Sequence, residues 1–382
     1  METIKPLYTE NYAQRAIIRR IFVERIQITN EKIMLLSEVM NYAQQATLKK
    51  PLESYAGARV SFSSYYYGGG FIFEGKLTQS EPEGLSYFLS DPYKKAEEIF
   101  DEIYLTGFPM NEKVLAICKD RLLQKYNKLQ ADSFASVLSE LQVNYSFPEL
   151  NVNLVRSMTL DDLAVGLKIV RSSLKGQYVF IGKKRKKEII HQEYEKTLSS
   201  LPFDFDVASK DVFSSSFQNE CATYILSINE VKGLKDVSML FVAFNAFSQA
   251  LKEKIKKNYN LDVELKVFII SPIKAGITIM VEKGRLLMVE KYLDNLFSLS
   301  PSAIDDYISK SIQDEKLLSV RLASDFDMAI MRMKLIADFA LPYSEEEFFN
   351  VEEITKEEVK KTVSTVKKIF AIKGSFDKGE TK

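Results

Sequence analysis

The sequence predicts an α+β protein of two homologous domains, each an antiparallel sheet flanked by helices. Two observations lead to this fold class. A segment that begins at Tyr55 and one that begins at Tyr259 both show the pattern of a strand, a turn and a returning strand. Each follows a predicted helix, and each half ends with a capped helix that leads into a strand. Hairpin strands beside runs of helices favour an α+β sheet over a doubly wound parallel sheet.

The first half is expected to run strand, helix, hairpin, helices, capped helix, strand. Asn30 is a plausible N-cap for the first helix, and Thr159 with Asp162 predicts a capping box for the last one. In chain order, these elements are expected at residues 16–28, 31–45, 55–74, 92–104, 112–129, 132–141, 160–174 and 177–182.

The second half repeats this order, and Thr355 with Glu358 predicts its capping box. Its elements are expected at residues 214–230, 235–257, 259–282, 285–297, 302–339, 356–369 and 370–374. The basic run 183–187 marks the boundary, so we expect one domain over residues 1–183 and another over 188–382. The run is either a solvated linker or a patch for nucleic acid or an acidic partner.

Bulk composition excludes several classes of protein. The 382 residues are enough for two domains or more. The 52 basic and 52 acidic residues cancel, which argues against a general nucleic-acid binder. No apolar run is long enough to cross a bilayer, and the first residues show no secretory signal. Two distant cysteines, Cys118 and Cys221, fit a reducing compartment, so a cytoplasmic location is expected.

The histidine count limits the chemistry most sharply. His191 is the only histidine of the chain. A multi-histidine metal site is therefore excluded, and at most one imidazole is left for catalysis. Because it lies in a charged stretch, we expect His191 to be a surface or partly buried residue.

At this point the order of elements resembles the insulinase/pitrilysin-type metallopeptidase family, in particular its processing-peptidase branch. The resemblance rests on the hairpin start Tyr55–Arg59, the strand Val179–Gly182, Ser199–Pro202 and the two capped helices. It covers nearly the whole chain through short motifs in a shared order. It implies two homologous α+β halves, each with an antiparallel sheet flanked by helices.

Active members of that family carry the zinc motif H-x-x-E-H on the first helix, and a later helix supplies a further glutamate. Here the corresponding segment reads Leu35, Leu36, Ser37, Glu38, Val39. Leu35 and Val39 stand where the histidines should, and apolar side chains cannot bind zinc. Glu112 and Asp120 on the later helix do not rebuild the site. We expect Glu38 to be a solvated or capping carboxylate.

The resemblance also implies a substrate-site pair in the second half. Family members supply an arginine and, seven residues later, a tyrosine that reach toward the substrate in the zinc site. Lys252 and Tyr259 have this spacing, with lysine in place of arginine. Lysine keeps the charge and loses the bidentate fork. The alternative is a surface lysine near a helix end and a tyrosine that packs at a strand start.

We therefore interpret the chain as the non-catalytic subunit of a heterodimeric zinc peptidase, with no cofactor of its own and with zinc in the partner. The expected partners are a homologous zinc-bearing subunit and a peptide substrate, which adds as a strand to a sheet edge. The expected substrate is a leader or precursor peptide, and the peptides of subtilosin-like bacteriocin maturation are one case that the resemblance suggests. The alternative is a peptide-binding or structural core scaffold with no role in hydrolysis.

One aromatic motif stays open between two interpretations. Tyr65, Tyr66 and Tyr67 precede three glycines. They form either an exposed hairpin tip that contacts a partner or substrate, or a simple aromatic hairpin. The glycines do not precede a helix or a Lys-Ser/Thr pair, so a phosphate loop is not supported.

Overall fold

The computed structural model describes residues 7–8, 12, 14–47, 59–80, 111–173, 176–182, 210–289, 304–350 and 353–376. The chain divides into two compact units, and each unit takes a segment from the opposite half of the sequence. The first unit comprises Met1–Asn127, Asn144–Asp204 and Ala323–Ala340; the second comprises Lys128–Val143, Phe205–Leu322 and Leu341–Lys382. Within the described ranges, no helix is both long and apolar enough to span a membrane.

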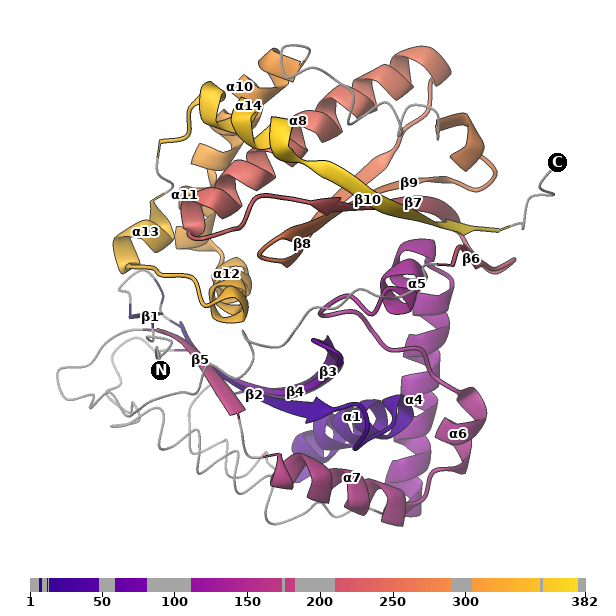
Figure 1. Cartoon of the computed structure of the whole chain (residues 1–382). Coiled ribbons are helices and arrows are strands. Elements are labelled where there is room, and N and C mark those ends of the chain that lie inside the picture. The colour runs from indigo at the N-terminus through magenta and orange to yellow at the C-terminus, as the bar shows by residue number, and fades with distance from the viewer. Residues whose placement is uncertain are drawn as a thin grey trace. The chain divides into compact units, whose positions relative to one another are not determined.

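The first unit is built around a five-stranded sheet with the order β1-β5-β2-β4-β3 (Figure 1). Its elements are β1 (Leu7–Tyr8), β2 (Gln14–Glu24), α1 (Asn30–Thr47), β3 (Arg59–Tyr67), β4 (Gly70–Ser80), most of α4 (Glu112–Gln130), α6 (Val152–Ser157), α7 (Leu160–Ser172), β5 (Gly176–Gly182) and α12 (Phe326–Phe339).

The second unit has a five-stranded sheet with the order β6-β10-β7-β9-β8. Its elements are α5 (Ser133–Glu140), β6 (Val212–Phe213), β7 (Asn219–Ser227), α8 (Leu234–Tyr259), β8 (Glu264–Ser271), β9 (Lys274–Glu282), α10 (Asp305–Lys316), most of α11 (Leu318–Ser324), α13 (Glu345–Phe349), α14 (Lys356–Thr365) and β10 (Lys367–Ser375).

The two sheets repeat one strand order, which confirms the α+β class and the repeated arrangement. The prediction of purely antiparallel sheets is corrected at one edge of each. Strand β1 pairs in parallel with β5, and β6 pairs in parallel with β10. The other pairings are antiparallel. Two-residue strands such as β1 and β6 are too short to produce an alternating pattern in the sequence.

The predicted helix starts are close to the observed ones. Helix α7 begins with a capping box between Thr159 and Asp162, and α14 begins with one between Thr355 and Glu358, as predicted. The cap of α1 lies one residue earlier than predicted. The hydroxyl of Thr29 accepts a hydrogen bond from Lys32 N at 3.3 Å. The side chain of Asn30 instead donates to the Tyr66 hydroxyl and the Glu149 carbonyl.

The predicted strand start at Tyr259 is wrong. Tyr259 is the last residue of α8, and Asn260 caps the helix with φ 54°, in the left-handed region that asparagine tolerates. The strand β8 begins only at Glu264. The break is hidden because Leu261 and Val263 extend the strand's alternation of apolar and polar residues back to Tyr259.

The two faces of the first sheet have different surroundings. On one face, Ile17, Ile21 and Val23 of β2 join a core with residues of α1, α4 and α7. Side chains alternate along a strand, so Arg20 points to the opposite face, where α12 packs. In Figure 1, α1 and α7 lie on one side of this sheet and α12 on the other.

The second sheet also carries a helix from the opposite half of the sequence. Helix α5 contacts β6, β7 and β10, while α8, α10 and α14 pack together. In Figure 1, these three helices lie on one side of the second sheet and α5 on the other. In the part of the chain that the structure describes, one face of each sheet is thus covered by a helix that comes from the opposite half of the sequence.

Several predicted features lie outside the described residues. These are the hairpin start at residues 55–58, the helix at 92–104, the boundary run at 183–187, His191, Ser199–Pro202 and most of the helix at 285–297. The domain boundary between residues 183 and 188 therefore stays a prediction.

Candidate functional site

The helix that resembles a zinc-binding helix presents apolar side chains to the core. Leu35 and Val39, which stand at the histidine positions of the motif, are 0% and 1% exposed. Both belong to the core cluster under the first sheet. Glu38 is oriented differently, and its carboxylate accepts a hydrogen bond from Lys125 Nζ at 3.3 Å. The two positions that would bind a metal thus serve packing, and Glu38 forms an ion pair, which refines its expected role as a solvated carboxylate.

The acids of the later helix do not complete a metal site. Glu112 and Asp120 are exposed on α4. The buried face of α4 carries Leu115, Cys118 and two further core residues. Burial raises the pKa of the Cys118 thiol to about 11, so it stays protonated at neutral pH. Among the residues that the structure describes, no group of three His, Cys, Asp or Glu side chains is placed to hold a metal ion.

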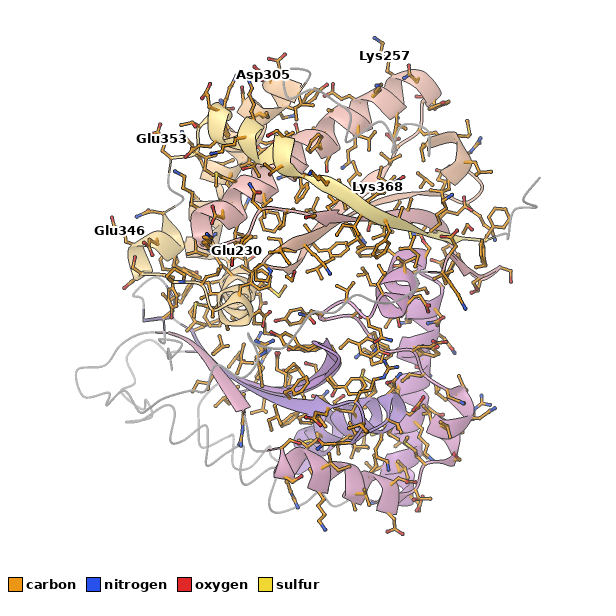
Figure 2. All side chains as sticks on the ribbon, in the orientation of Figure 1. Glu230, Lys257, Asp305, Glu346, Glu353 and Lys368 are labelled. Atoms are coloured by element: carbon orange, nitrogen blue, oxygen red, sulfur yellow. The ribbon has the colours of Figure 1, made fainter. Side chains whose placement is uncertain are left out.

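The predicted substrate pair lies on one helix. Lys252 is exposed and Tyr259 is half-buried near the C-terminal end of α8. Seven residues of α-helix place the two positions on nearly one face, about 10.5 Å apart along the axis. In Figure 2, the nearby Lys257 points away from the ribbon of α8. The two positions therefore lie on one side of α8, and their role stays a prediction.

The tyrosine run is not an exposed hairpin tip. Tyr65, Tyr66 and Tyr67 are at most 7% exposed. They end β3 before a tight turn in which Gly68 and Gly69 have positive φ. The simpler interpretation of an aromatic hairpin is correct, and two of its hydroxyls join a buried polar network.

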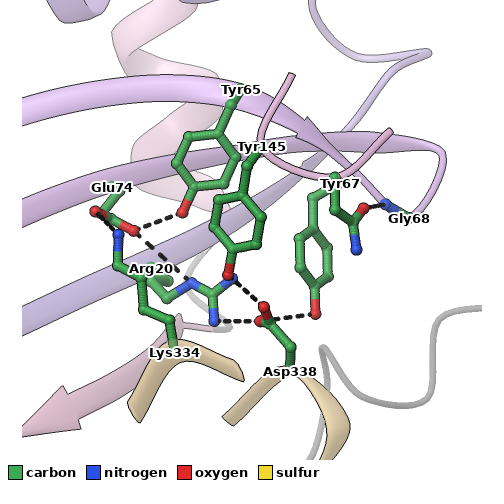
Figure 3. A network of polar contacts seen from close by, with 9 residues as sticks. Arg20, Tyr65, Tyr67, Gly68, Glu74, Tyr145, Lys334 and Asp338 are labelled. Atoms are coloured by element: carbon green, nitrogen blue, oxygen red, sulfur yellow. Dashed lines mark hydrogen bonds and ion pairs between the residues drawn. The ribbon is translucent and has the colours of Figure 1, made fainter. Parts of the chain in front are cut away.

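A buried arginine lies at the centre of this network, on the face of the first sheet that α12 covers (Figure 3). Arg20 is 0% exposed. Its NH1 lies 2.7 Å from Oδ1 of Asp338, and its NH2 donates to the hydroxyl of Tyr145 at 2.9 Å. Its Nε lies 3.9 Å from Oε2 of Glu74 on the neighbouring strand. A buried guanidinium needs such partners, because an unpaired charge is costly away from water.

A second cation completes the network from α12. Lys334 Nζ donates to Glu74 Oε1 at 2.6 Å, and the hydroxyl of Tyr65 donates to Glu74 Oε2 at 2.5 Å. The hydroxyl of Tyr67 donates to Asp338 at 3.1 Å. Two cations and two carboxylates therefore balance within the network. Together with Tyr145, three tyrosine hydroxyls donate to these carboxylates, so each of the four carboxylate oxygens has a partner.

The electrostatics hold the arginine and the tyrosines of this cluster in one ionisation state. Burial alone would lower the pKa of Arg20, but the charge of Asp338 together with the surrounding tyrosine oxygens outweighs it, so the pKa lies well above its usual value. Burial, together with the negative charge of Glu74, raises the pKa of Tyr65 well above its usual value. The tyrosines are therefore neutral hydrogen-bond donors to the two carboxylates, which suits a structural role better than proton transfer.

The outer edge of β3, the last strand of this sheet, is closed by the chain itself. The side-chain amide of Asn41 bonds both backbone groups of Phe62, accepting at 2.7 Å and donating at 2.6 Å. Farther along, Tyr66 N donates to the carbonyl of Ser146 at 3.1 Å, and Tyr145 N donates to the carbonyl of Tyr66 at 2.9 Å. Outward-facing backbone groups alternate along an edge strand, so two of the three outward positions from Phe62 to Tyr66 are already bonded.

Sequence reasoning missed the network because its members come from distant segments. One signal was present: Arg20 interrupts the apolar strand between Ile18 and Ile21. A charge at the centre of such a strand needs a partner of opposite charge. The sequence does not say that Asp338, more than three hundred residues away, supplies it.

No protein-family model and no curated protein matches this sequence. Solved structures do match it over nearly its whole length. A crystal structure of a conserved protein from Enterococcus faecalis V583 matches with a TM-score of 0.67 and 12% identity, covering 97% of this chain and 95% of that one. A peptidase M16 inactive domain from Pseudomonas fluorescens matches with a TM-score of 0.57 and 12% identity, covering 98% of this chain and 99% of that one.

The chain has the fold of M16 peptidase domains. A third match, the periplasmic protease PqqL from Escherichia coli, gives the scale of the likeness. Its TM-score is 0.57 at 14% identity, and the match covers 97% of this chain but 44% of PqqL. The present chain therefore corresponds to about half of that protease and to the whole of the inactive domain. The fold implied by the resemblance to pitrilysin-type peptidases is confirmed.

Proposed function

We propose that this chain is the non-catalytic subunit of a two-chain zinc peptidase, in which a homologous partner carries H-x-x-E-H. One observation carries the proposal: Leu35 and Val39, at the positions of the zinc ligands, are buried in the core. Since His191 is the only histidine, no other segment of the chain can supply two imidazole ligands. We infer further that the repeated strand order reflects two homologous domains. The chain itself would need no cofactor.

Lys252 and Tyr259 are the residues proposed to act on the substrate. From one face of α8, a lysine ammonium and a phenol hydroxyl would bind the peptide carbonyl at the partner's zinc and stabilise the developing oxyanion. Lysine supplies one point charge in place of the planar fork of arginine. Its contribution therefore depends on charge and reach.

The proposed substrate is an extended leader or precursor peptide, with a bacteriocin precursor as one specific case. Main-chain hydrogen bonds to a sheet edge would bind such a peptide with little dependence on its sequence. In this chain the β3 edge is closed, so the peptide would pair with an edge of the partner or with the second sheet. Two reduced, buried cysteines are compatible with the proposed cytoplasmic location.

The test is reconstitution with a zinc-bearing homologue of similar size. The pair should cleave an unfolded peptide, while neither chain should do so alone. Lys252→Ala and Tyr259→Phe should each lower kcat/KM by about 100-fold, the scale for loss of one oxyanion donor. Lys252→Arg should retain the activity, because it restores the family's residue.

Lys257→Ala is the matched control, since Lys257 is an exposed lysine on the same helix. It should leave kcat/KM unchanged. Equal activity of all four variants would reject the substrate-site role. The measured affinity between the two chains separates this role from a loss of assembly.

A scaffold without any role in hydrolysis is the second candidate. It is favoured by the likeness to a domain described as inactive and by the closed edge of β3. Unchanged cleavage by the partner alone, with or without this chain, would support it over the first proposal.

A further inference from the structure

The segment that closes the β3 edge has an unusual backbone. Tyr145 and Ser146 together oppose the single residue Tyr66, as in a β-bulge whose first residue is in the left-handed region. Tyr145 has φ 69°. Glycine is the usual residue there, because a side chain is strained at positive φ. A tyrosine keeps this conformation only where its surroundings stabilise it.

The side chain of Tyr145 supplies that stabilisation. Its hydroxyl donates to Oδ2 of Asp338 in a short hydrogen bond and accepts from Arg20 at 2.9 Å. Its ring packs on Tyr65 with 4.7 Å between the ring centroids. Figure 3 shows the phenol pointing from its loop into the network, toward the side chain of Asp338 on α12. The same residue therefore bonds the sheet edge through its backbone and α12 through its hydroxyl.

A second contact holds the start of this segment. The side-chain oxygen of Asn144 accepts from Gly68 N at 3.0 Å, at the tip of the β3–β4 hairpin. Asn144, Tyr145 and Ser146 thus occupy the hairpin end of the edge in the manner of a short added strand. A peptide that pairs at Tyr66 has to displace them, since it needs the same N–H and carbonyl groups.

We propose that Asn144–Ser146 is an internal cap that closes the β3 edge to strand addition, and that the contact between Tyr145 and Asp338 is the latch of this cap. With α12 docked, the hydroxyl of Tyr145 is held and the edge is closed. When Asp338 withdraws, Tyr145 loses its main stabilising partner and its backbone relaxes. The hairpin end of the edge, beyond the Phe62 position that Asn41 holds, then accepts a short extended peptide. The inference goes beyond the proposed function, since it concerns the chain without a partner or zinc.

The experiment compares Tyr145→Phe and Asp338→Asn with the unaltered chain. Amide hydrogen exchange at Tyr66 reports opening of the edge, and the amide of Phe73 in the central strand β4 reports global unfolding. Loss of hydrogen bonds to charged groups should speed exchange at Tyr66 by about tenfold, and Tyr66 should exchange faster than Phe73 in every chain, because its opening does not require global unfolding. Tyr145→Phe keeps all four charges of the network, so it tests the latch even if Asp338→Asn does not fold.

The second readout is binding of a fluorescent peptide with the sequence of residues 142–148, which is the cap supplied in trans. Both latch variants should bind it, and the unaltered chain should not. The matched control is Asp327→Asn, because Asp327 lies on the same helix but pairs at the surface with Lys76. The control should behave like the unaltered chain in both readouts.

Two results would overturn the proposal. The first is exchange at Tyr66 that is as slow in folded Tyr145→Phe as in the unaltered chain. The second is equal binding of the peptide by the unaltered chain and the latch variants. Neither result bears on Lys252 and Tyr259, whose test measures hydrolysis by the reconstituted pair.

Discussion

Helices α12 and α5 occupy corresponding places in the two units, yet different kinds of contact hold them: buried ion pairs for α12 and close packing of small residues for α5. Helix α12 binds the first sheet through buried ion pairs, with Lys334 and Asp338 opposite Glu74 and Arg20. Helix α5 approaches the second sheet through small side chains, and a Cβ built on Gly374 would lie 3.0 Å from Cβ of Ser133. The same arrangement, a sheet covered by a helix from the opposite half of the sequence, can therefore be stabilised by either kind of contact.

The difference matters because the two kinds of contact fail in different ways. A balanced network of buried charges depends on every member, since the loss of one leaves another unpaired. Close packing of small residues depends on volume and tolerates changes of charge elsewhere. The first sheet is thus the one whose covering helix can transmit a local change to its edge strand.

The largest effect is expected at the centre of the charged contact. Arg20→Leu leaves the carboxylate of Asp338 without its buried cation, and the free energy of unfolding should fall by about 3–5 kcal/mol. Denaturant titration of the folded chain measures it. As a control, Lys76→Ala removes an ion pair with the largely exposed Asp327 and should cost about 1 kcal/mol or less. Similar losses in the two variants would remove the distinction between buried network and surface pair.

A smaller effect is expected where α5 meets the second sheet. In Gly374→Ala, the new methyl group meets the backbone carbonyl of Ser133 at 3.1 Å and Sγ of Cys221 at 3.1 Å. Neither neighbour moves freely, so overpacking should cost about 1–3 kcal/mol. Gly233→Ala is the matched control, because nothing lies within 4 Å of its Cβ position. Thermal unfolding of both variants measures the contrast, and equal stability would argue against close packing as the basis of α5 docking.

The smallest effects test a feature that the two halves share. Thr159→Ala and Thr355→Ala each remove a capping box and should each cost about 1 kcal/mol. The halves should respond alike here, in contrast to the two helix contacts. A large difference between these caps would show that the repeat does not extend to local stability.

The cap of α14 also predicts a pH dependence. Hydrogen bonds from Thr355 and the ion pair with Lys235 lower the pKa of Glu358 to about 2. Because the pKa of Glu358 is lower in the folded chain than in the unfolded chain, its carboxylate stabilises the folded state at pH values above the unfolded-state pKa. This stabilisation is lost as the pH falls through about 2. Glu358→Gln should therefore lower stability at pH 7, and the difference from the unaltered chain should shrink below pH 4. A difference that is constant with pH would exclude the carboxylate as the source.

The sequence predicts elements with a local signal and misses contacts between distant segments. Capping boxes and apolar periodicity correctly placed α7, α8 and α14, because these signals lie within a few residues of each other. The reversal at Asn260 was missed, since the alternating pattern of the following strand extends back to Tyr259. The pairing of Arg20 with Asp338 has no local signal, because it depends on the exchange of α12 between the units.

The lack of zinc ligands at the position of the family's motif was visible in the sequence for a different reason. An absence of histidine is visible in the composition, and no fold can compensate for missing ligands. The structure adds that Leu35 and Val39 pack in the core. The closed edge of β3, in contrast, depends on a backbone bulge at Tyr145, and no residue type in the sequence marks it.

Whether this chain is catalytic by itself can be tested by measuring the zinc content of the purified chain together with its hydrolysis of an unfolded peptide. A non-catalytic chain should hold far less than one tightly bound zinc ion per chain and should show no cleavage that a chelator abolishes. One zinc ion per chain, with chelator-sensitive cleavage in the absence of any other polypeptide, would contradict the non-catalytic role.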